Sequence, residues 1–553
     1  MATSGDQLLH FYMPRIFWHD RQAILSIDVL QQRQTETKKL ERCDQNQPTM
    51  YKIVTASMQK EIRVWNFCFV EKFLASSTKK PMTSNTEPKI VPIQIEKPSA
   101  ISSKPQLQIG DDEDSIMFLD DTEKENETKK SEADDANCKM ETEHVRKQNG
   151  EIEVDGSNRK ADRQASIVPQ KTLSVEFLSN IESHRGTTNV VRFSPNGAYI
   201  ASGDADGFLY VWKLEQQSVA ESEVQVVEGV TEERKRGGDP EMDIPPNKET
   251  WVRAFRSPIR HDGDVTGLCW SPDSQMLASV SMDDSVAVHR ADSGKRVWAV
   301  RNFRHFANGI VWDPRGKYLV AMSTDRRMDV LDAVKGTRLR CCHQIELPTT
   351  PLRRFDGTEI HQKLYKVFHD DQLFAFQRGV EFSPCGGVVL APAVHLEVAA
   401  LNVYGVFAFL RSELDRCRPA ALFQSAKPAI QAKCSPVLYR LEHGPNFLGL
   451  SHRLIFAVLC RDSVLLYSSQ NEFPLAYIEN LQYDKLTSMA WTPDGRVLVV
   501  SSMEGFNSFI TVDLAKLGIP SDQQSAIAFV GDDTPMSPLY KAKKQIRKRC
   551  TEK

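Results

Sequence analysis

Short apolar strands separated by tight turns recur along most of the chain. An apolar or aromatic residue followed by Ser, Asp or Thr, then by Pro, any residue and Gly, marks the end of a strand four times, and a fifth copy lacks only the glycine. Proline presets φ for the turn and glycine supplies a positive φ, so each copy predicts a tight turn. The copies begin at Phe193, Trp270, Trp312, Phe382 and Trp491.

A second apolar strand follows each turn, and a third comes after a short turn that carries an acidic residue. Residues 201–212 align without gaps with residues 278–289, so that Asp206 and Asp283 take the same place. Asp325 and Asp462 take this place in two later units. The repeated unit is therefore a set of short antiparallel strands.

A histidine precedes the acidic residue at nearly constant spacing. The pairs are His184 with Asp206 and His261 with Asp283, both 22 residues apart, and His305 with Asp325, 20 residues apart. A catalytic site needs one such pair, whereas a structural brace needs one in every unit. We therefore expect these pairs to join strands within a unit.

Seven units can be counted, and they predict an all-β, seven-bladed β-propeller. They cover residues 23–67, 187–212, 262–289, 305–331, 377–410, 430–470 and 484–512. The apolar segment 8–18 precedes the first unit and has no partner there. We expect it to form the outer strand of the last blade, which would close the ring and leave fewer exposed strand edges.

Two polar segments interrupt the repeats. Residues 76–172 have no sustained period, and 111–155 hold 17 acidic against 6 basic residues. Such a segment buries too little apolar surface to offset the entropy of ordering, so we expect disorder. It is either a solvated loop or an acidic arm for basic partners, in which Phe118 and Leu119 are candidate contacts. Residues 215–250 predict a mobile loop.

The end of the chain is basic. Its cluster consists of Lys541, Lys543, Lys544, Arg547, Lys548 and Arg549. This is either a solvated tail, or a nuclear import signal or nucleic-acid contact. The expected organisation is a closing strand and blade one (1–75), the acidic insertion (76–172), blade two (173–214), the mobile loop (215–250), blades three to seven (251–520) and the tail (521–553).

Motifs of enzyme chemistry are missing. The sequence holds no phosphate-binding, dinucleotide-binding, serine-hydrolase or zinc-protease signature, and its 11 cysteines include no C-x2-C pair. We expect reduced core cysteines and no catalytic residue, metal or cofactor. We see no secretory signal, and the apolar run 388–410 predicts two strands rather than a membrane helix. A net charge of −3 does not suit a polycation that coats nucleic acid.

One compact polar cluster, His369-Asp370-Asp371 after Phe368, resembles a metal or acid–base trio. Adjacent residues on a strand point to opposite faces, so the three would not converge without a special turn. The remaining interpretations are that the cluster anchors a loop or that Phe368 to Asp371 contact a partner.

Phrases between the repeats are more specific than the repeats themselves. Those at 175–180, 189–195, 247–251, 365–371, 378–384, 453–458, 462–467 and 517–520 resemble the WD-repeat (middle) subunit of chromatin assembly factor 1. The resemblance covers nearly all of the predicted propeller. It implies a nuclear, non-enzymatic scaffold that joins a large and a small subunit of a histone chaperone complex. That complex would deposit newly made histones three and four on replicating DNA, with indirect DNA contact and no membrane.

The chain departs from this family in two places. The acidic insertion is longer than the family's usual connection. The tail through which the family helps recruit the anti-silencing histone chaperone has no match here beyond the basic residues 541–549.

Two other functions compete with this one. The WD-repeat chaperone of replication-independent histone deposition shares the propeller, but its members continue into a long second domain, which we do not expect here. A general scaffold such as a ubiquitin-ligase substrate receptor would carry an added receptor module, and none is evident.

Overall fold

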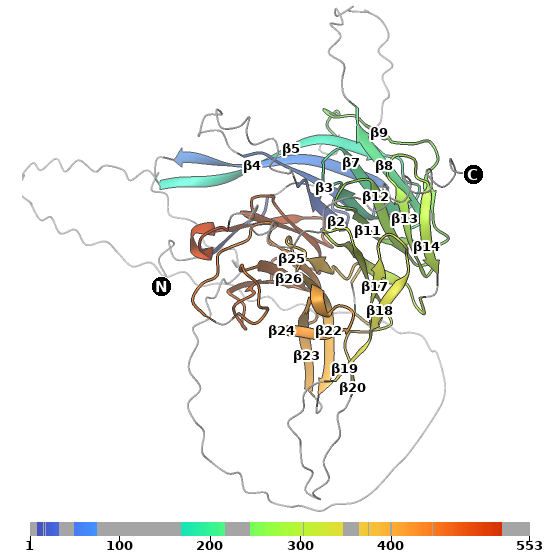
Figure 1. The fold of residues 1–553 in the computed structure, drawn as a ribbon. Helices are drawn as coiled ribbons and strands as arrows, with labels where there is room; N and C mark the ends of the chain where they lie inside the picture. The colour runs from blue at the N-terminus through green and yellow to red at the C-terminus, as the bar shows by residue number, and fades with distance from the viewer. Residues whose placement is uncertain are drawn as a thin grey trace, which may run out of the picture. The chain divides into compact units, whose positions relative to one another are not determined.

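Seven antiparallel sheets are arranged around a common axis in the computed structural model (Figure 1). The structure describes residues 8–31, 49–74, 168–215, 244–346 and 364–521, apart from 15, 17, 302, 374, 399, 400 and 445. Within these ranges the regular elements are strands and two short 3-10 helices, η2 (Arg411–Glu413) and η3 (Leu514–Leu517). The predicted seven-bladed, all-β propeller is confirmed.

Blades one to four each run outward from the axis in chain order. Blade one consists of β2 (Ile24–Val29), β3 (Tyr51–Ser57), β4 (Glu61–Leu74) and β5 (Val168–Glu182). Blade two consists of β6 (Thr188–Phe193), β7 (Tyr199–Asp204), β8 (Phe208–Leu214) and the short β9 (Trp251–Arg253) and β10 (Ile259–Arg260). Blade three consists of β11 (Val265–Trp270), β12 (Met276–Ser281), β13 (Ser285–Arg290) and β14 (Arg296–Arg301). Blade four consists of β15 (Ala307–Trp312), β16 (Tyr318–Ser323), β17 (Arg327–Asp332) and β18 (Arg338–Cys342).

Blades five to seven follow the same plan, and the last one borrows a strand from the start of the chain. Blade five consists of β21 (Glu381–Phe382), β22 (Val388–Val398), β23 (Leu401–Leu410) and β24 (Pro419–Ser425). Blade six consists of β25 (Ala429–Cys434), β26 (Ile455–Cys460), β27 (Ser463–Ser468) and β28 (Ala476–Glu479). Blade seven consists of β29 (Leu486–Trp491), β30 (Val497–Ser502), β31 (Asn507–Val512) and β1 (Leu9–Tyr12). A separate pair, β19 (Gln344–Glu346) and β20 (Leu364–Lys366), lies between blades four and five in sequence.

The core lies between neighbouring blades. All six residues of β12 are buried, because both faces of this inner strand pack against adjacent sheets, whereas the outer strand β14 alternates between exposed and half-buried positions. Strands buried on both faces carry nearly continuous apolar runs, which explains the sequence pattern. The innermost strands β2, β6, β11, β15, β21, β25 and β29 contact one another in turn, and β29 returns to β2.

The ring closes as the sequence predicts. β1 pairs antiparallel with β31, and Leu9, Phe11 and Tyr12 stand opposite Val512, Ile510 and Phe509. Leu9 is only 3% exposed and packs in a cluster with residues of blades six and seven. The two ends of the propeller are therefore held together by one shared sheet.

Two expected blade boundaries are wrong. The sequence pattern places residues 173–182 in blade two, but they belong to β5, which pairs with β4 as the outer strand of blade one. It places residues 251–260 in blade three, but β9 and β10 pair with β8 in blade two. The sequence repeat begins with the outer strand of the preceding blade, so a boundary placed at the first strand signal falls one strand too early.

The apolar run 388–410 forms two strands, as expected. β22 and β23 pair along nearly their whole length, with an irregularity between Ala391 and Val394. In the described part of the chain, no helix is long and apolar enough to cross a membrane.

The expectation of wholly reduced cysteines is wrong at one position. Cys342 at the end of β18 and Cys417 just before β24 form a disulfide that joins blades four and five. Both residues lie in the apolar cluster between these blades, which brings them close. Six other cysteines of the described residues are free, and four of them are buried.

The closing strand should contribute strongly to stability. We expect Leu9→Ala to lower the free energy of unfolding by about 2–4 kcal/mol, because the substitution leaves a cavity in a packed cluster. The measurement is thermal and chemical denaturation of the full chain, and deletion of residues 1–18 should lower the melting temperature further. The matched control is His10→Ala on the half-buried side of the same strand. Equal stability of the two point variants would contradict this role of β1.

Candidate functional site

Blade two contains a complete polar brace. The Trp212 indole N–H donates to Ser202 Oγ at 2.9 Å, and Ser202 Oγ lies 2.7 Å from His184 Nε2. His184 Nδ1 lies 2.8 Å from Asp204 Oδ2, and neither side chain is exposed. Because each group satisfies its neighbour, four polar side chains are buried at little cost and hold the connection between β5 and β6 against β7 and β8.

The predicted partner of His184 is wrong by two residues. Asp204, not Asp206, accepts its hydrogen bond, and Asp204 also accepts the backbone N–H groups of Asp206 and Phe208 at 3.1 and 2.7 Å. Asp206 lies in the turn, and it takes part in the brace only through its backbone N–H, which donates to Asp204. The gap-free alignment with blade three therefore identifies the right kind of residue at the wrong position.

Blade three has the brace at the predicted residues. His261 Nδ1 lies 3.2 Å from Asp283 Oδ2, and His261 Nε2 lies 2.8 Å from Ser279 Oγ. His289 takes the place that Trp212 has in blade two, and its Nδ1 is buried without a partner among the described residues. Burial lowers the pKa of His261 and, together with the nearby His261 ring, lowers the pKa of His289 to about 4.

The third predicted pair does not form. His305 is exposed, while Asp325 pairs with Arg327 at 2.9 Å. Asp462 is likewise paired with a cation, Lys427, at 2.5 Å, and not with a histidine. Blades four and six therefore use ion pairs where blades two and three use the histidine brace.

Blade one has a further brace that the spacing does not reveal. His19 Nε2 lies 2.9 Å from Thr55 Oγ1, which also accepts the indole N–H of Trp65 at 3.3 Å. In blades two and three the histidine precedes its serine by 18 residues, but His19 precedes Thr55 by 36. The longer connection hides the spacing pattern in the sequence. Trp65, near the end of its repeat, is a signal from which this brace could have been predicted.

The predicted contact segment, Phe368 to Asp371, is only partly accessible. Phe368 is fully buried in the cluster between blades four and five, so the expectation that it contacts a partner directly is wrong. His369 is half-buried and Asp371 is exposed. His369 Nδ1 lies 2.9 Å from Asp370 Oδ1, but no metal-binding group of three His, Cys, Asp or Glu side chains occurs among the described residues.

A buried arginine holds this segment in place. Arg378 is fully buried and donates to the carbonyl oxygens of Ser323 at 2.8 Å, of His369 at 2.7 Å and of Asp370. Burial lowers the pKa of Arg378 to about 10. Nothing in the sequence singles out Arg378, because its partners are backbone carbonyls distant in sequence.

An aromatic cluster borders the segment. The ring of His369 stacks on His395 with centroids 4.7 Å apart, and His395 stacks on Tyr404 at 5.1 Å. Arg326 fixes the cluster by donating to the carbonyl of Phe368 at 2.6 Å. The arrangement supports the loop-anchoring interpretation and leaves Asp370 and Asp371 at the surface.

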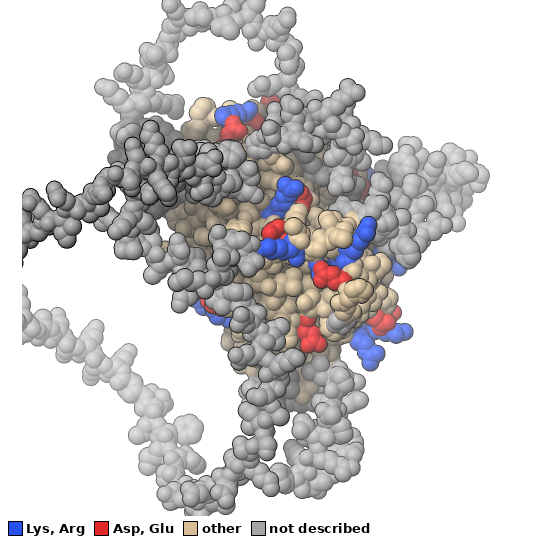
Figure 2. All heavy atoms as spheres, turned by 90° about the vertical axis from the view of Figure 1, so that its left-hand side faces the viewer, with Lys and Arg blue, Asp and Glu red and all other residues tan. Residues whose placement is uncertain are grey.

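Two groups of predicted site residues lie outside the described residues. These are Phe118 and Leu119 in the acidic insertion, and the basic cluster Lys541, Lys543, Lys544, Arg547, Lys548 and Arg549. On the face of the propeller shown in Figure 2, basic and acidic side chains are interspersed rather than gathered by sign.

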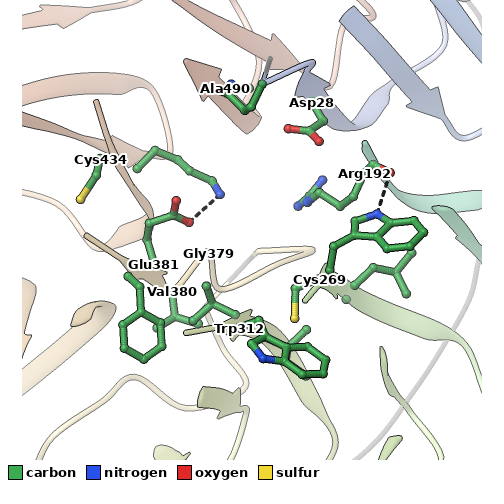
Figure 3. Close-up of a pocket in the computed structure, with 18 of the residues that line it drawn as sticks. Asp28, Arg192, Cys269, Trp312, Gly379, Val380, Glu381, Cys434 and Ala490 are labelled. Carbon is green, nitrogen blue, oxygen red and sulfur yellow. Dashed lines mark hydrogen bonds and ion pairs between the residues drawn. The ribbon is translucent and has the colours of Figure 1, made fainter. Parts of the chain in front are cut away.

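A cavity of about 420 Å³ lies on the propeller axis, at the end where Pro-containing turns connect the two inner strands of blades two to five. The next-to-last residue of every innermost strand lines it, and so does the last residue, which also packs in the core between blades. The seven next-to-last residues, one from each blade, are Asp28, Arg192, Cys269, Val311, Glu381, Lys433 and Ala490. We call this set the axial ring, and Figure 3 shows five of its members around a common space.

The charges of the axial ring are unevenly paired. Glu381 and Lys433 form an ion pair at 2.7 Å. Arg192 donates to neutral acceptors, at 2.7 Å each: Ser26 Oγ, the carbonyl of Val191 and Gln377 Oε1. Asp28 accepts the N–H of Phe193 at 2.8 Å, and burial raises the pKa of its carboxyl.

One turn of blade five carries a cysteine in an acceptor position. In sister turns, an oxygen of Asn196, Asp273 or Asp494 accepts a Ser or Thr hydroxyl and a backbone N–H. Cys385 Sγ takes that position, 3.2 Å from Ser383 Oγ and 3.4 Å from the N–H of Gly387, with His452 Nε2 at 3.2 Å. Burial alone would raise the pKa of this thiol, but these hydrogen bonds outweigh it and the pKa lies below its usual value.

Taken together, the seven blades and the Trp–Ser–His–Asp brace define a WD-repeat β-propeller. The model of the CAF1B/HIR1 β-propeller domain matches residues 164–517. The chain is 30% identical over 380 residues to the B subunit of chromatin assembly factor 1 from Mus musculus, covering 66% of this chain and 62% of that protein. It is also 30% identical over 364 residues to the corresponding B subunit from Saccharomyces cerevisiae, covering 62% of this chain and 74% of that protein.

Protein HIR1 of Kluyveromyces lactis is a further relative, 25% identical over 367 residues, covering 64% of this chain and 38% of that protein. The chain belongs to the CAF1B/HIR1 β-propeller family. The match spans less than two thirds of the length of the mouse relative.

The brace of blade two provides a direct test of the corrected pairing. We expect Asp204→Ala to lower the free energy of unfolding by about 1–3 kcal/mol or more, because it leaves a buried histidine N–H unpaired. Asp206→Ala is the matched control and should change it by less than about 0.5 kcal/mol. Urea denaturation of both variants would measure the difference. A larger loss for Asp206→Ala would restore the pairing expected from the alignment.

Cys385 should be the most reactive of the buried free thiols at neutral pH. Burial raises the pKa of Cys434, and that of Cys460 to about 12, so these thiols serve as internal controls. We expect methyl methanethiosulfonate to modify Cys385 first, as measured by peptide mass spectrometry over time. His452→Ala should slow the reaction, although it widens access. Faster modification in that variant would show that access, and not ionisation, controls the rate.

Proposed function

We propose that this chain is the β-propeller subunit of a histone chaperone complex of the chromatin assembly factor 1 type. It would join a large and a small subunit, and the complex would deposit newly made histones three and four on replicating DNA in the nucleus. Membership in the CAF1B/HIR1 β-propeller family carries this proposal. The chain is 30% identical to each of two proteins named as B subunits of chromatin assembly factor 1, and 25% identical to a protein named HIR1. This difference favours the chromatin assembly factor 1 type.

The geometry favours a scaffold without enzymatic activity. Two of the His–Asp pairs that could serve acid–base chemistry, His184 with Asp204 and His261 with Asp283, are buried in braces. A rigid propeller presents the loops of seven blades at fixed positions, which suits the simultaneous binding of several partners. The role proposed for the surface is therefore recognition.

The segment Phe368 to Asp371 is the proposed contact for a partner subunit. Arg378 fixes the backbone of this segment through two carbonyl groups, so binding at its acidic side chains would need little further ordering of the backbone. Asp371 is exposed and Asp370 is partly so. A basic segment of a partner would match these two carboxylates. The basic residues 541–549 remain a proposed nuclear signal, and binding of the anti-silencing histone chaperone remains a proposal without a matching motif.

Affinity purification of the tagged full chain from nuclear extract tests the proposed function. We expect mass spectrometry to recover the large and small subunits of chromatin assembly factor 1 in stoichiometric amounts, together with histones three and four. Asp371→Arg should reduce recovery of one subunit several-fold. The matched control is Asp415→Arg, an exposed residue in the connection between β23 and β24 of blade five.

Other outcomes would overturn the proposal in distinct ways. Recovery of the partners of the replication-independent chaperone would keep the propeller and the histone connection but change the pathway. Recovery of ubiquitin-ligase components would replace the function altogether. Equal recovery with both point variants would remove Asp371 from the interface and leave the complex itself in place.

A further inference from the structure

The axial cavity contains hydrogen-bond donors that the protein itself does not satisfy. A guanidinium group carries five N–H donors in a planar fork. Those of Arg192 make three hydrogen bonds, to Ser26, Val191 and Gln377, which leaves two donors without an acceptor among the described residues. The side-chain amide of Gln377 also lines the cavity, is 8% exposed, and its Nε2 has no partner there.

These donors lie close together. Gln377 Oε1 accepts from Arg192 at 2.7 Å, so the unpartnered amide nitrogen of Gln377 and the free edge of the guanidinium belong to one group. A buried donor without an acceptor costs roughly 1–3 kcal/mol. An acceptor that enters the cavity would remove this cost at Gln377 and could also pair with the free donors of Arg192.

The axial ring also contains an unpaired carboxylate, that of Asp28. Whether the cavity prefers an anion or a cation depends on which of two charges, that of Asp28 or that of Arg192, a change of protonation can remove. Among the described residues neither Asp28 nor Arg192 forms an ion pair, whereas Glu381 and Lys433 neutralise each other. A guanidinium stays charged at any pH that a folded protein meets. Asp28 can take up a proton, and burial raises its pKa despite the positive charges of Arg192 and Lys433.

This difference between the permanent charge of Arg192 and the removable charge of Asp28 argues against a cation as the ligand of the cavity. A bound cation would face the permanent charge of Arg192, which nothing in the ring can remove. A bound anion would pair with Arg192, and the opposing charge of Asp28 would disappear on protonation. The protonated carboxyl could then donate a further hydrogen bond.

We propose that the axial cavity is a binding site for a carboxylate group, held by Arg192 and Gln377. A carboxylate fits because its two oxygens accept parallel N–H donors of a guanidinium. The turn-lined end of the cavity can admit the acidic side chain of a peptide or a small free carboxylate. This site does not depend on the role in chromatin assembly.

Fluorescence anisotropy of a labelled hexaglutamate peptide with the purified full chain measures the binding. Arg192→Gln should weaken it about tenfold to a hundredfold, as expected for loss of a charge-assisted hydrogen bond. Asp28→Asn should tighten it, because the amide has the shape of the protonated acid without its charge. The wild-type affinity should rise as the pH falls toward the pKa of Asp28, and Asp28→Asn should remove this dependence.

Controls separate the site from general electrostatics. Arg304→Gln removes an exposed positive charge outside the cavity and should leave the affinity unchanged. Thermal denaturation checks that each variant is folded, and the gain in Asp28→Asn cannot arise from unfolding. Displacement of the peptide by succinate would show that a free carboxylate suffices, whereas no displacement would show that the peptide is required.

Two results would overturn the proposal. The first is no binding of either carboxylate probe at millimolar concentration. The second is binding of a labelled hexalysine peptide that is lost in Asp28→Asn, since this would make Asp28 the ligand-binding group and the ligand a cation.

Discussion

The antiparallel pairing of β1 with β31 is the constraint on which the rest of the propeller depends. Each blade is a small sheet with two apolar faces, and it is stable only when both faces are covered by neighbours. Blade seven covers one face of blade one and one face of blade six, yet it lacks an outer strand until Leu9 to Tyr12 join it. Residues near the start of the chain therefore complete the last blade, and the seven interfaces make a closed ring.

This closure also fixes the position of the innermost strands. β29 contacts β2 directly, so the inner ends of the seven blades form a continuous ring around the axis. The next-to-last residue of each innermost strand lines the axial cavity, even in blades one and six, where a long connection joins the two inner strands. The axial ring is thus a geometrical consequence of repetition, while its residue types are free to differ from blade to blade.

The repeat-dependent features could be predicted well, because repetition itself carries the signal. The number of blades and the brace of His261 with Asp283 follow from the repeat and its spacing, and the closing strand follows from an apolar segment that has no partner in the first unit. The errors arise where spacing changes. The long connection before Thr55 hides His19, and the two-residue difference between Asp204 and Asp206 is invisible in an alignment without gaps.

Features that occur only once in the chain could not be predicted from repetition. Some of them lie between the two candidate sites, the axial cavity and the surface at Asp370 and Asp371. The burial of Phe368 depends on the packing of blade four against blade five, which a local pattern does not report.

Gln377 and Arg378 are adjacent in sequence, yet one reaches Arg192 in the axial cavity and the other holds the carbonyls of His369 and Asp370. The backbone that positions Gln377 therefore also positions Arg378. Gly379 follows directly, and a Cβ there would lie 2.1 Å from Gln431 Cγ, so this backbone is tightly packed and has little room to absorb a displacement. The axial cavity and the acidic surface at Asp370 and Asp371 are therefore both built on one stretch of three consecutive residues.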